Sequence, residues 1–485
     1  MTRTILALDQ GTTSTRAIRF DAHGRPLQIA ARELPQYYPR AGWVEHDPED
    51  IWRDAQAVIR EAIDDSVAAI GITNQRETIL LWDRQTGKCL HNAIVWQDRR
   101  TADLCAQLRA DGVEPMVRGK TGLLLDPYFS ATKLAWLLDH VDGARARADR
   151  GELAAGTIDS FLLWRLTGGA VHATDVTNAG RTMLFDIVRM DWDDELLRLF
   201  QIPRSLLPEV RGNAEIFGET TLFGRALPIA GMAGDQQAAL IGQACFSPGM
   251  VKSTYGTGCF LLSHTGAEPV ISDNRLLATP AYRIGGETAY ALEGSIFVAG
   301  AAVKWLRDGI GLIADAAESA DVAAQVPDDH AVVLVPAFVG LGAPHWAPHA
   351  RGLIAGLTLD TSAQMIVRAT LESIAFQTRD LIDAMAAEGA ARPPAIRIDG
   401  GMAANDWFAS FLADMLDATV ERPACTETTA LGAATLAGLA IGLRPDIASV
   451  AAHWHADATF EPTMPAAHRD DLLAAWHKAL ERALL

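Results

Sequence analysis

Short apolar runs separated by glycine- and threonine-rich turns occur at two places in the chain. Thr4–Phe20 has an apolar run, the turn DQGTTST and a second run that begins at Arg16. Met250–Ser263 (MVKSTYGTGCFLLS) repeats this order. Because a Gly–Thr turn between two β-rich runs is a hairpin signal, we predict two hairpins and, from their recurrence, a duplicated architecture.

Helical and strand-like periods alternate around these hairpins. Asp47 and Pro48 have the pattern of a helix cap followed by proline in the first turn, with apolar residues at helical spacing after them. Further helices are expected over Ser362–Ala387, capped by Thr361, and over Ala404–Leu416. Strands are expected over Ala68–Thr73, Ile79–Trp82, Ala93–Trp96, Val332–Pro336 and Ile396–Asp399. The pattern predicts an α/β protein in two halves, residues 1–245 and 246–485, divided near Cys245–Pro248.

Size, charge and cysteine content narrow the class of protein. At roughly 150 residues per domain, 485 residues suit two large domains or three smaller ones. The formal net charge of −18 argues against nucleic acid or an anionic membrane surface as the main partner. Five scattered cysteines without a C-x-x-C pair favour a reducing cytoplasm over a disulfide framework or a zinc site. No uncharged stretch is long enough for a membrane span, so we expect no membrane insertion.

The first candidate cluster is the turn of the N-terminal hairpin, which contains Gly11 and Thr12–Thr15. Glycine allows a ligand to approach the backbone, and successive N–H groups and hydroxyls can bind phosphate oxygens. Asp9 at the strand end could hold magnesium through water, since Mg²⁺ prefers oxygen ligands and keeps part of its hydration shell. The alternative is an ordinary polar hairpin.

Two further clusters each combine glycines with a helix start. Asp235 follows Gly231 and Gly234 and could accept a proton from a hydroxyl at the edge of a crevice; alternatively it is a helix N-cap. Asp399-Gly400-Gly401, with Asn405 at the next helix start, could lie against a nucleoside, or could be a tight turn without a ligand. Neither the P-loop spacing nor G-x-G-x-x-G occurs at these positions.

A fourth cluster contains Arg76, Glu77, Trp96 and Tyr128. A guanidinium fork beside a carboxylate suits the adjacent hydroxyls of a small polyol. The two charged residues must then lie at a strand end, because in mid-strand they would point to opposite faces. The alternatives are a surface salt bridge for Arg76 and Glu77 and core packing for Trp96 and Phe260.

Taken together, the motifs resemble the glycerol kinases within the wider family of carbohydrate kinases that share the actin–hexokinase–heat-shock ATPase fold. The resemblance extends from Ile5 to about Arg444. It rests on DQGTTSTR, GITNQRET, IVWQDRR, TGLLLDPYFSATK, AGDQQAALIGQ, STYGTGCF, ALEGSIFVAGAAVKWLRD, PAFVGLGAPHWAPHARG and DGGMAAND, in this order. NQRET, DPYFS and GDQQAA are the segments that single out glycerol.

The resemblance implies two related RNase H-like (actin-like ATPase) domains that flank a central cleft, and ATP-dependent phosphorylation of glycerol to sn-glycerol 3-phosphate. It implies magnesium near Asp9 and Asp235 as the base. The implied glycerol ligands are Arg76, Glu77, Tyr128, Asp235 and Gln236, with Trp96 and Phe260 against the carbon face. The implied ATP ligands are Thr12, Thr13, Ser14, Arg16, Thr257, Gly300, Gly401 and Asn405. A homo-oligomer, a dimer or a tetramer, is also expected.

Several segments depart from the family pattern. Lys304 stands where glycerol kinases often have an uncharged polar residue, and HWAP at 345–348 lacks the usual aspartate. The loop TTLFGRALP at 220–228 is shorter than the one that binds fructose 1,6-bisphosphate in some members, and the stretch after Phe460 does not resemble the surface that regulatory phosphotransferase proteins grip. We therefore expect neither form of regulation.

Two other functions remain open from the sequence. One is a kinase for another polyol or ketose, such as erythritol or xylulose. The other is an actin-like or chaperone-type ATPase, which needs no second substrate pocket.

Overall fold

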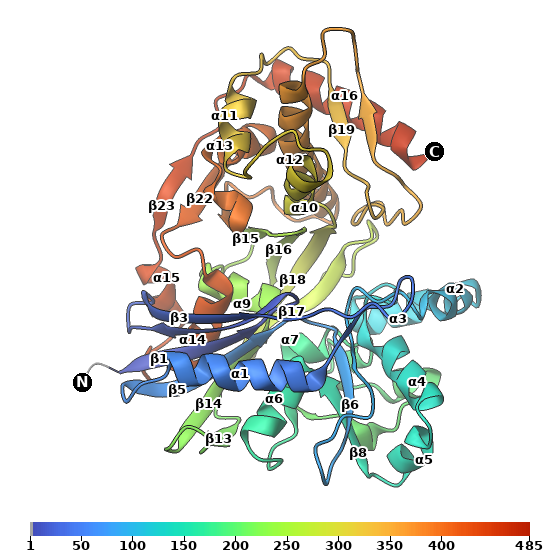
Figure 1. Cartoon of the computed structure of the whole chain (residues 1–485), viewed down its shortest axis with the longest axis vertical. Helices are drawn as coiled ribbons and strands as arrows, with labels where there is room; N and C mark the ends of the chain where they lie inside the picture. Colours follow the sequence, from blue (N-terminus) through green and yellow to red (C-terminus); the bar gives the residue numbers. More distant parts are fainter. Residues whose placement is uncertain (1–2) are drawn as a thin grey trace.

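The computed structural model describes residues 3–485 and is built around two large sheets. The first sheet has the spatial order β13 (Gly218–Thr220), β14 (Leu227–Gly234), β5 (Val67–Asn74), β1 (Thr4–Gln10), β2 (Ser14–Phe20) and β3 (Pro26–Glu33). β1 is antiparallel to β2 and parallel to β5, and β5 is parallel to β14. This sheet forms the centre of the lower lobe in Figure 1.

The second sheet repeats that arrangement. Its order is β17 (Leu277–Ile284), β18 (Glu287–Ile296), β16 (Cys259–Gly266), β15 (Val251–Tyr255), β21 (Ala395–Asp399), β22 (Thr419–Pro423) and β23 (Ala456–Phe460). The hairpin β15–β16 corresponds to β1–β2, and β21 and β22 run parallel to β15 as β5 and β14 do to β1. The duplicated α/β architecture predicted from the two hairpins is therefore confirmed.

Smaller elements complete the two lobes. A third sheet has the order β4 (Glu45–His46), β7 (Ala93–Ile94), β6 (Ile79–Asp83) and β8 (Leu153–Thr157). Three two-stranded sheets pair β9 (Ala173–Asp175) with β12 (Glu209–Arg211), β10 (Phe185–Asp186) with β11 (Asp191–Trp192), and β19 (Val333–Val335) with β20 (Leu353–Ala355).

The helices of the first half are α1 (Pro48–Ala62), α2 (Ala102–Ala110), α3 (Glu114–Thr121), α4 (Ser130–His140), α5 (Ala144–Asp149), α6 (Ile158–Leu166), α7 (Val176–Ala179), α8 (Asp194–Leu199) and α9 (Asp235–Gly242). Those of the second half are α10 (Gly300–Lys304), α11 (Glu318–Ala324), α12 (Ala363–Ala387), α13 (Asp406–Leu416), α14 (Thr428–Ala440), α15 (Ile447–His453) and α16 (Ala466–Leu484).

The first sheet is covered on its two faces by helices from different parts of the chain. Side chains alternate along β1, so that Leu6 and Leu8 pack in the cluster that contains α1, whereas Ile5 and Ala7 pack in the cluster that contains α14. Although α14 comes late in the sequence, it lies in the lower lobe of Figure 1 and packs against β1, β5 and β14. The last third of the chain thus completes the core of the first lobe.

Helices α9 and α14 meet at unusually close range. A Cβ atom on Gly432 would lie 1.8 Å from the Ala238 carbonyl oxygen, and one on Gly242 would lie 2.0 Å from that of Thr428. Only glycine fits at these two positions, because a real Cβ atom essentially never approaches another heavy atom within 3.0 Å. The crossing fixes α9, whose first residue is Asp235, against the first lobe.

Several element ends differ by one or two residues from the sequence expectations, and three of these differences are informative. Ser362, not Thr361, caps α12 by accepting a hydrogen bond from Met365 N. The helix expected from Ala404 begins at Asp406, after the cap Asn405. The strand expected over Ala93–Trp96 ends at Ile94, because the backbone N–H of Trp96 donates to the Thr78 hydroxyl at 3.2 Å and is not part of a strand ladder.

Candidate active site

The predicted polyol residues come together because two parallel strands end side by side. Asn74 at the end of β5 is paired in register with Gly234 at the end of β14. Arg76 and Glu77 follow the first strand and Asp235 follows the second, so their side chains share one edge of the sheet. Arg76 and Glu77 both lie beyond the end of β5, and Glu77 has a φ of 61°, so the objection that neighbouring strand residues face opposite sides does not apply.

Arg76 and Glu77 belong to a buried ionic network. Arg76 donates to both carboxylate oxygens of Glu293 at 2.6 and 3.0 Å. Arg181 donates to Glu77 at 2.6 Å and to Glu293 at 3.0 Å. All four side chains are at most 2% exposed, so the interpretation of Arg76 and Glu77 as a surface salt bridge is wrong. Sequence reasoning missed Arg181, which lies outside the quoted motifs, and Glu293, which lies in the motif ALEGSIFVAG but was given no role there.

The two carboxylates of the network have pKa values that are shifted in opposite directions. Burial alone would raise the pKa of Glu293, but Arg181 and Arg76 outweigh it and bring the value to about 2. Burial raises the pKa of Glu77, and Arg181 and Arg76 compensate only in part. Glu293 is therefore the firmly ionised carboxylate that both guanidinium groups share.

Asp235 is the first residue of α9, and its side chain remains 30% exposed. Its Oδ1 lies 3.2 Å from Arg76 Nε and accepts from Gln236 N at 2.7 Å. The cap position itself belongs to Gly234, so the interpretation of Asp235 as an N-cap is wrong. Burial raises the pKa of Asp235, while Arg76 and Lys252 lower it. Among residues 3–485 no hydrogen bond engages the other carboxylate oxygen of Asp235, Oδ2. Its raised pKa lies closer to neutrality, which suits proton acceptance.

Three aromatic rings from both halves of the chain adjoin this carboxylate cluster. Trp96 makes edge contacts with Tyr128 and Phe260, with centroid distances of 5.5 and 6.3 Å. The indole N–H of Trp96 donates to the Thr12 hydroxyl at 2.9 Å, which links the aromatic group to the N-terminal hairpin. Burial raises the pKa of Tyr128, so its phenol stays neutral and can donate a hydrogen bond. The rings thus connect the predicted polyol and phosphate residues.

The N-terminal hairpin presents accessible donors at its turn. Gly11 N donates to Ser14 O at 2.9 Å, Thr13 is exposed, and Thr12 and Ser14 are half-buried. At the base of the turn Arg16 bridges Asp9 at 2.9 Å and Glu427 at 2.7 Å. Burial raises the pKa of Asp9, which is 4% exposed, and Arg16 offsets part of this shift.

The residues around the N-terminal hairpin suit a magnesium ion that has few direct protein ligands. Arg16 engages Oδ2 of Asp9, and among residues 3–485 no hydrogen bond involves Oδ1. No group of three or more His, Cys, Asp or Glu side chains in this part of the chain could hold a metal. Mg²⁺ in kinase sites is bound by one or two carboxylates, waters and the substrate's own phosphates, so a single carboxylate at the phosphate hairpin suits it.

The second hairpin faces the site from the other half. Its turn contains Gly256 and Thr257, which are both exposed. Gly300 N donates to Gly256 O at 2.9 Å, and a Cβ on Gly300 would lie 2.6 Å from that oxygen, so glycine is required there. Gly401 has open space around its Cα.

Asn405 is engaged within the protein. Its Oδ1 accepts from Phe408 N at 2.9 Å as the cap of α13, and its Nδ2 lies 3.3 Å from Ser319 Oγ.

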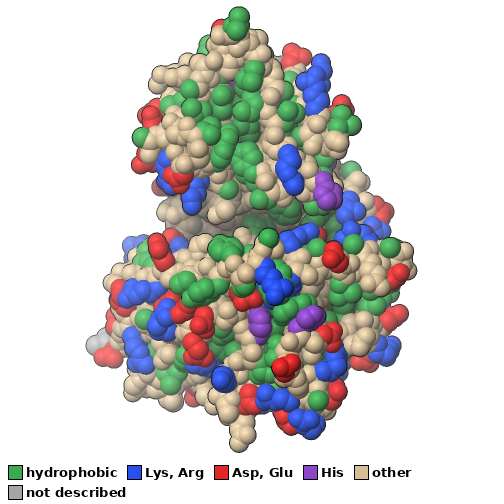
Figure 2. Space-filling view, turned by 45° about the vertical axis from the view of Figure 1, so that its right-hand side comes forward, with side chains coloured by type: hydrophobic (Ala, Val, Ile, Leu, Met, Phe, Trp, Pro, Cys, Tyr) green, Lys and Arg blue, Asp and Glu red, His purple; other side chains and the backbone are tan. Residues whose placement is uncertain are grey.

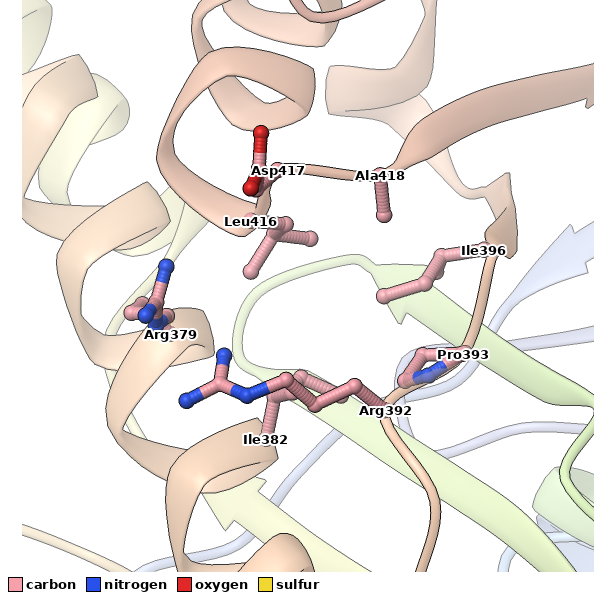
Figure 3. Close-up of a pocket in the computed structure, with 8 residues that line it drawn as sticks. All are labelled: Arg379, Ile382, Arg392, Pro393, Ile396, Leu416, Asp417 and Ala418. Carbon is pink, nitrogen blue, oxygen red and sulfur yellow. The ribbon is translucent and has the colours of Figure 1, made fainter. Parts of the chain in front are cut away.

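The two lobes leave a recessed band between them, which Figure 2 shows as a waist across the space-filling surface. A separate pocket of about 200 Å³ lies between α12, β21 and the start of β22 (Figure 3). Arg379 and Arg392 on its wall both pair with Asp383, and Arg469 pairs with Asp417. None of the predicted site residues lines this pocket, and its charges already have partners.

Comparison with known families places the chain among sugar and polyol kinases. Residues 4–242 match the N-terminal domain, and residues 251–441 the C-terminal domain, of the FGGY family of carbohydrate kinases. The chain belongs to this family. Within it, the chain is 62% identical to a glycerol kinase of Gluconobacter oxydans, over 99% of this chain and 95% of that protein. It is 60% identical to a glycerol kinase of Rhodospirillum centenum, over 99% and 97% of the two chains.

Solved structures agree with that placement. A Plasmodium falciparum glycerol kinase with ADP is 38% identical and superposes with a TM-score of 0.94, covering 100% of this chain and 99% of that one. A xylulose kinase of Lactobacillus acidophilus, 23% identical with a TM-score of 0.89, covers 99% and 97% and shares the fold. The two-domain actin-like ATPase type of fold predicted from the motifs is confirmed. Among the helices of residues 3–485, none has both the length and the apolar character needed to cross a bilayer.

Proposed function

We propose that this chain transfers the terminal phosphoryl group of ATP to glycerol and forms sn-glycerol 3-phosphate. The observation that carries the proposal is the buried Arg76–Glu77 pair beside Asp235, in a chain whose full-length relatives include glycerol kinases at up to 62% identity. A guanidinium donor, a carboxylate acceptor and a second carboxylate match three neighbouring hydroxyls.

Glycerol binding uses charged groups for its hydroxyls and rings for its carbon chain. Arg76 donates to hydroxyl oxygens, Glu77 accepts from hydroxyl groups, and the neutral phenol of Tyr128 and the amide of Gln236 complete the contacts. Trp96 and Phe260 pack against the carbon atoms. Because Arg76 and Glu77 are held by Glu293 and Arg181, binding requires little reorganisation of the pocket.

The phosphates of ATP are assigned to both hairpins. Thr12, Thr13, Ser14 and Arg16 act from the first half, and Thr257 and Gly300 act from the second; Gly401 lies at the adenosine. Since Asn405 already caps α13, its part in binding is to fix the start of that helix. A magnesium ion held through water at Asp9 supplies charge neutralisation at the phosphate oxygens.

Asp235 accepts the proton of the attacking terminal hydroxyl. Phosphoryl transfer asks the protein mainly for in-line positioning and charge compensation, so one base and several donors suffice. Arg76, 3.2 Å from Oδ1, keeps the carboxylate oriented toward the substrate. Exclusion of water from the cleft prevents hydrolysis of ATP.

The test is to incubate the purified protein with magnesium-ATP and, separately, with glycerol, erythritol, xylulose and dihydroxyacetone, and to identify the products by mass spectrometry and ³¹P NMR. We expect glycerol 3-phosphate from glycerol at the highest kcat/KM of the four. A higher kcat/KM for erythritol or xylulose would reject the substrate assignment and retain the phosphotransfer mechanism.

A further inference from the structure

Lys252 is a fully buried lysine on β15 that none of the roles above uses. Its Nζ donates to three oxygens: the Gln236 side-chain Oε1, the Thr254 hydroxyl at 3.0 Å and the Phe260 carbonyl at 3.4 Å. Gln236 belongs to α9 in the first half of the chain, whereas Thr254 and Phe260 flank the turn of the second hairpin. One ammonium group therefore ties a proposed glycerol ligand to the hairpin of the other half.

The contact decides which end of the Gln236 amide faces the pocket. An ammonium group can only donate, so the atom beside Nζ must be the amide oxygen. The Nε2 group, with its two donors, then points away from Lys252, and no hydrogen bond among residues 3–485 engages it. Gln236, a residue that is only 7% exposed, is thereby set as a donor toward a hydroxyl oxygen.

The charge of Lys252 also lies among the ionised groups of the site. All three acceptors of Nζ are uncharged, and a buried ammonium without a contacting carboxylate costs stability. Burial lowers the pKa of Lys252, as does Arg76, while Asp399, Glu293 and Asp235 raise it. Asp235 in turn is influenced by Arg76, Lys252 and Asp9, and of these the two cations lower its pKa.

We propose that Lys252 is a positioning residue for the transfer reaction: it fixes the amide of Gln236, the residue that follows Asp235, as a donor to glycerol, and it places a positive charge near the Asp235 carboxylate. This inference rests on the proposed glycerol kinase function. It assigns to the second half of the chain a part in shaping the glycerol pocket, in addition to its nucleotide contacts.

The test compares Lys252→Met with Lys252→Arg and with Lys120→Met, which removes a half-buried lysine that pairs with Asp193 and Glu195 outside the site. In Lys252→Met we expect KM for glycerol to rise about tenfold, as expected for one lost hydrogen bond, with KM for ATP within about twofold of wild type. We also expect the acid limb of kcat/KM to move to higher pH, because loss of the cation raises the pKa of Asp235. Lys252→Arg should restore the position of that limb, and Lys120→Met should change neither quantity.

Three outcomes distinguish the possible failures. Wild-type protein that does not phosphorylate glycerol rejects the proposed function itself. Active wild type with an unchanged glycerol KM and acid limb in a folded Lys252→Met variant rejects the positioning role. If Lys252→Met does not fold, Thr254→Val, which removes one acceptor at nearly constant volume, must raise the glycerol KM without changing that for ATP; an unchanged value overturns the inference.

Discussion

At the scale of single residues, the site combines ionised groups that are fixed with one that is free to act. Glu293 holds Arg76 and Arg181 and has its pKa depressed to about 2. Asp235 keeps 30% of its side chain exposed and has a raised pKa. This contrast supports the proposed roles, a structural one for Glu293 and a proton-accepting one for Asp235.

Asp235→Asn is expected to lower kcat by about 10² to 10⁴, the usual contribution of a general base, while glycerol still binds. The substitution keeps the shape of the side chain and removes its ability to accept a proton. Steady-state kinetics give kcat and isothermal titration gives glycerol affinity. Near-normal turnover by the variant would remove Asp235 from the mechanism.

Glu293→Gln is expected to destabilise the protein by about 3–5 kcal/mol, because it leaves two buried guanidinium groups without their central counter-charge. Glu49→Gln is the matched control, since Glu49 is 61% exposed and its pair with Arg165 contributes no more than about 1 kcal/mol. Thermal unfolding at pH 7 compares the two variants. Equal losses in both would show that the buried network does not stabilise the fold.

The contribution of Glu293 to stability should depend on pH in a defined direction. Its folded pKa of about 2 lies below the ordinary value of 4.5, so its stabilisation is complete above pH 4.5 and is lost as pH falls toward 2. The difference in thermal midpoint between wild type and Glu293→Gln should therefore shrink across this window. A difference that stays constant from pH 7 to pH 3 would contradict the assignment.

At the scale of elements, the position of Asp235 depends on how α9 crosses α14. The two helices approach at Gly242 and Gly432 so closely that a methyl group on either would overlap backbone. Because α14 also packs on β1 in the small-residue cluster with Ile5 and Ala7, it links the base-bearing helix to the phosphate hairpin.

Gly432→Ala is expected to destabilise the protein by about 1–3 kcal/mol through overpacking against Ala238. Gly438→Ala in the same helix is the control, because its Cβ would meet Arg444 at an ordinary 3.5 Å and alanine favours the helix. Thermal unfolding should separate the two, with Gly438→Ala at or above wild type. Equal midpoints for both variants would show that the crossing tolerates a methyl group.

The sequence predicted the elements better than their contacts. Both hairpins, α1 and α12 have strong local signals: glycine–threonine turns, a capping aspartate and apolar periodicity. The packing of α14 on the first sheet had no such signal, since a helix of alanine, glycine and leucine has no distinct apolar face. Arg181 and Glu293 were missed for a related reason, because each is a lone charge whose partner is distant in the sequence: Arg181 and Glu77 are 104 residues apart, and Arg76 and Glu293 are 217 residues apart.

At the scale of the whole molecule, the duplicated sheets place one hairpin on each side of a cleft. The first half supplies Arg76, Glu77 and Asp235, and the second supplies Phe260, Thr257 and the network residue Glu293. Trp96 and Phe260 meet across this division with their ring centroids 6.3 Å apart. The proposed glycerol pocket therefore draws on both halves, and we expect polyol binding and ATP turnover to be coupled.

The most direct test of the proposed glycerol kinase activity is the initial rate of ADP formation from magnesium-ATP with and without glycerol. We expect a low rate without glycerol, a large stimulation by glycerol, and one glycerol 3-phosphate formed for each ADP. Slow ATP hydrolysis that is indifferent to glycerol and to every other polyol would contradict it and would favour an actin-like or chaperone-type ATPase.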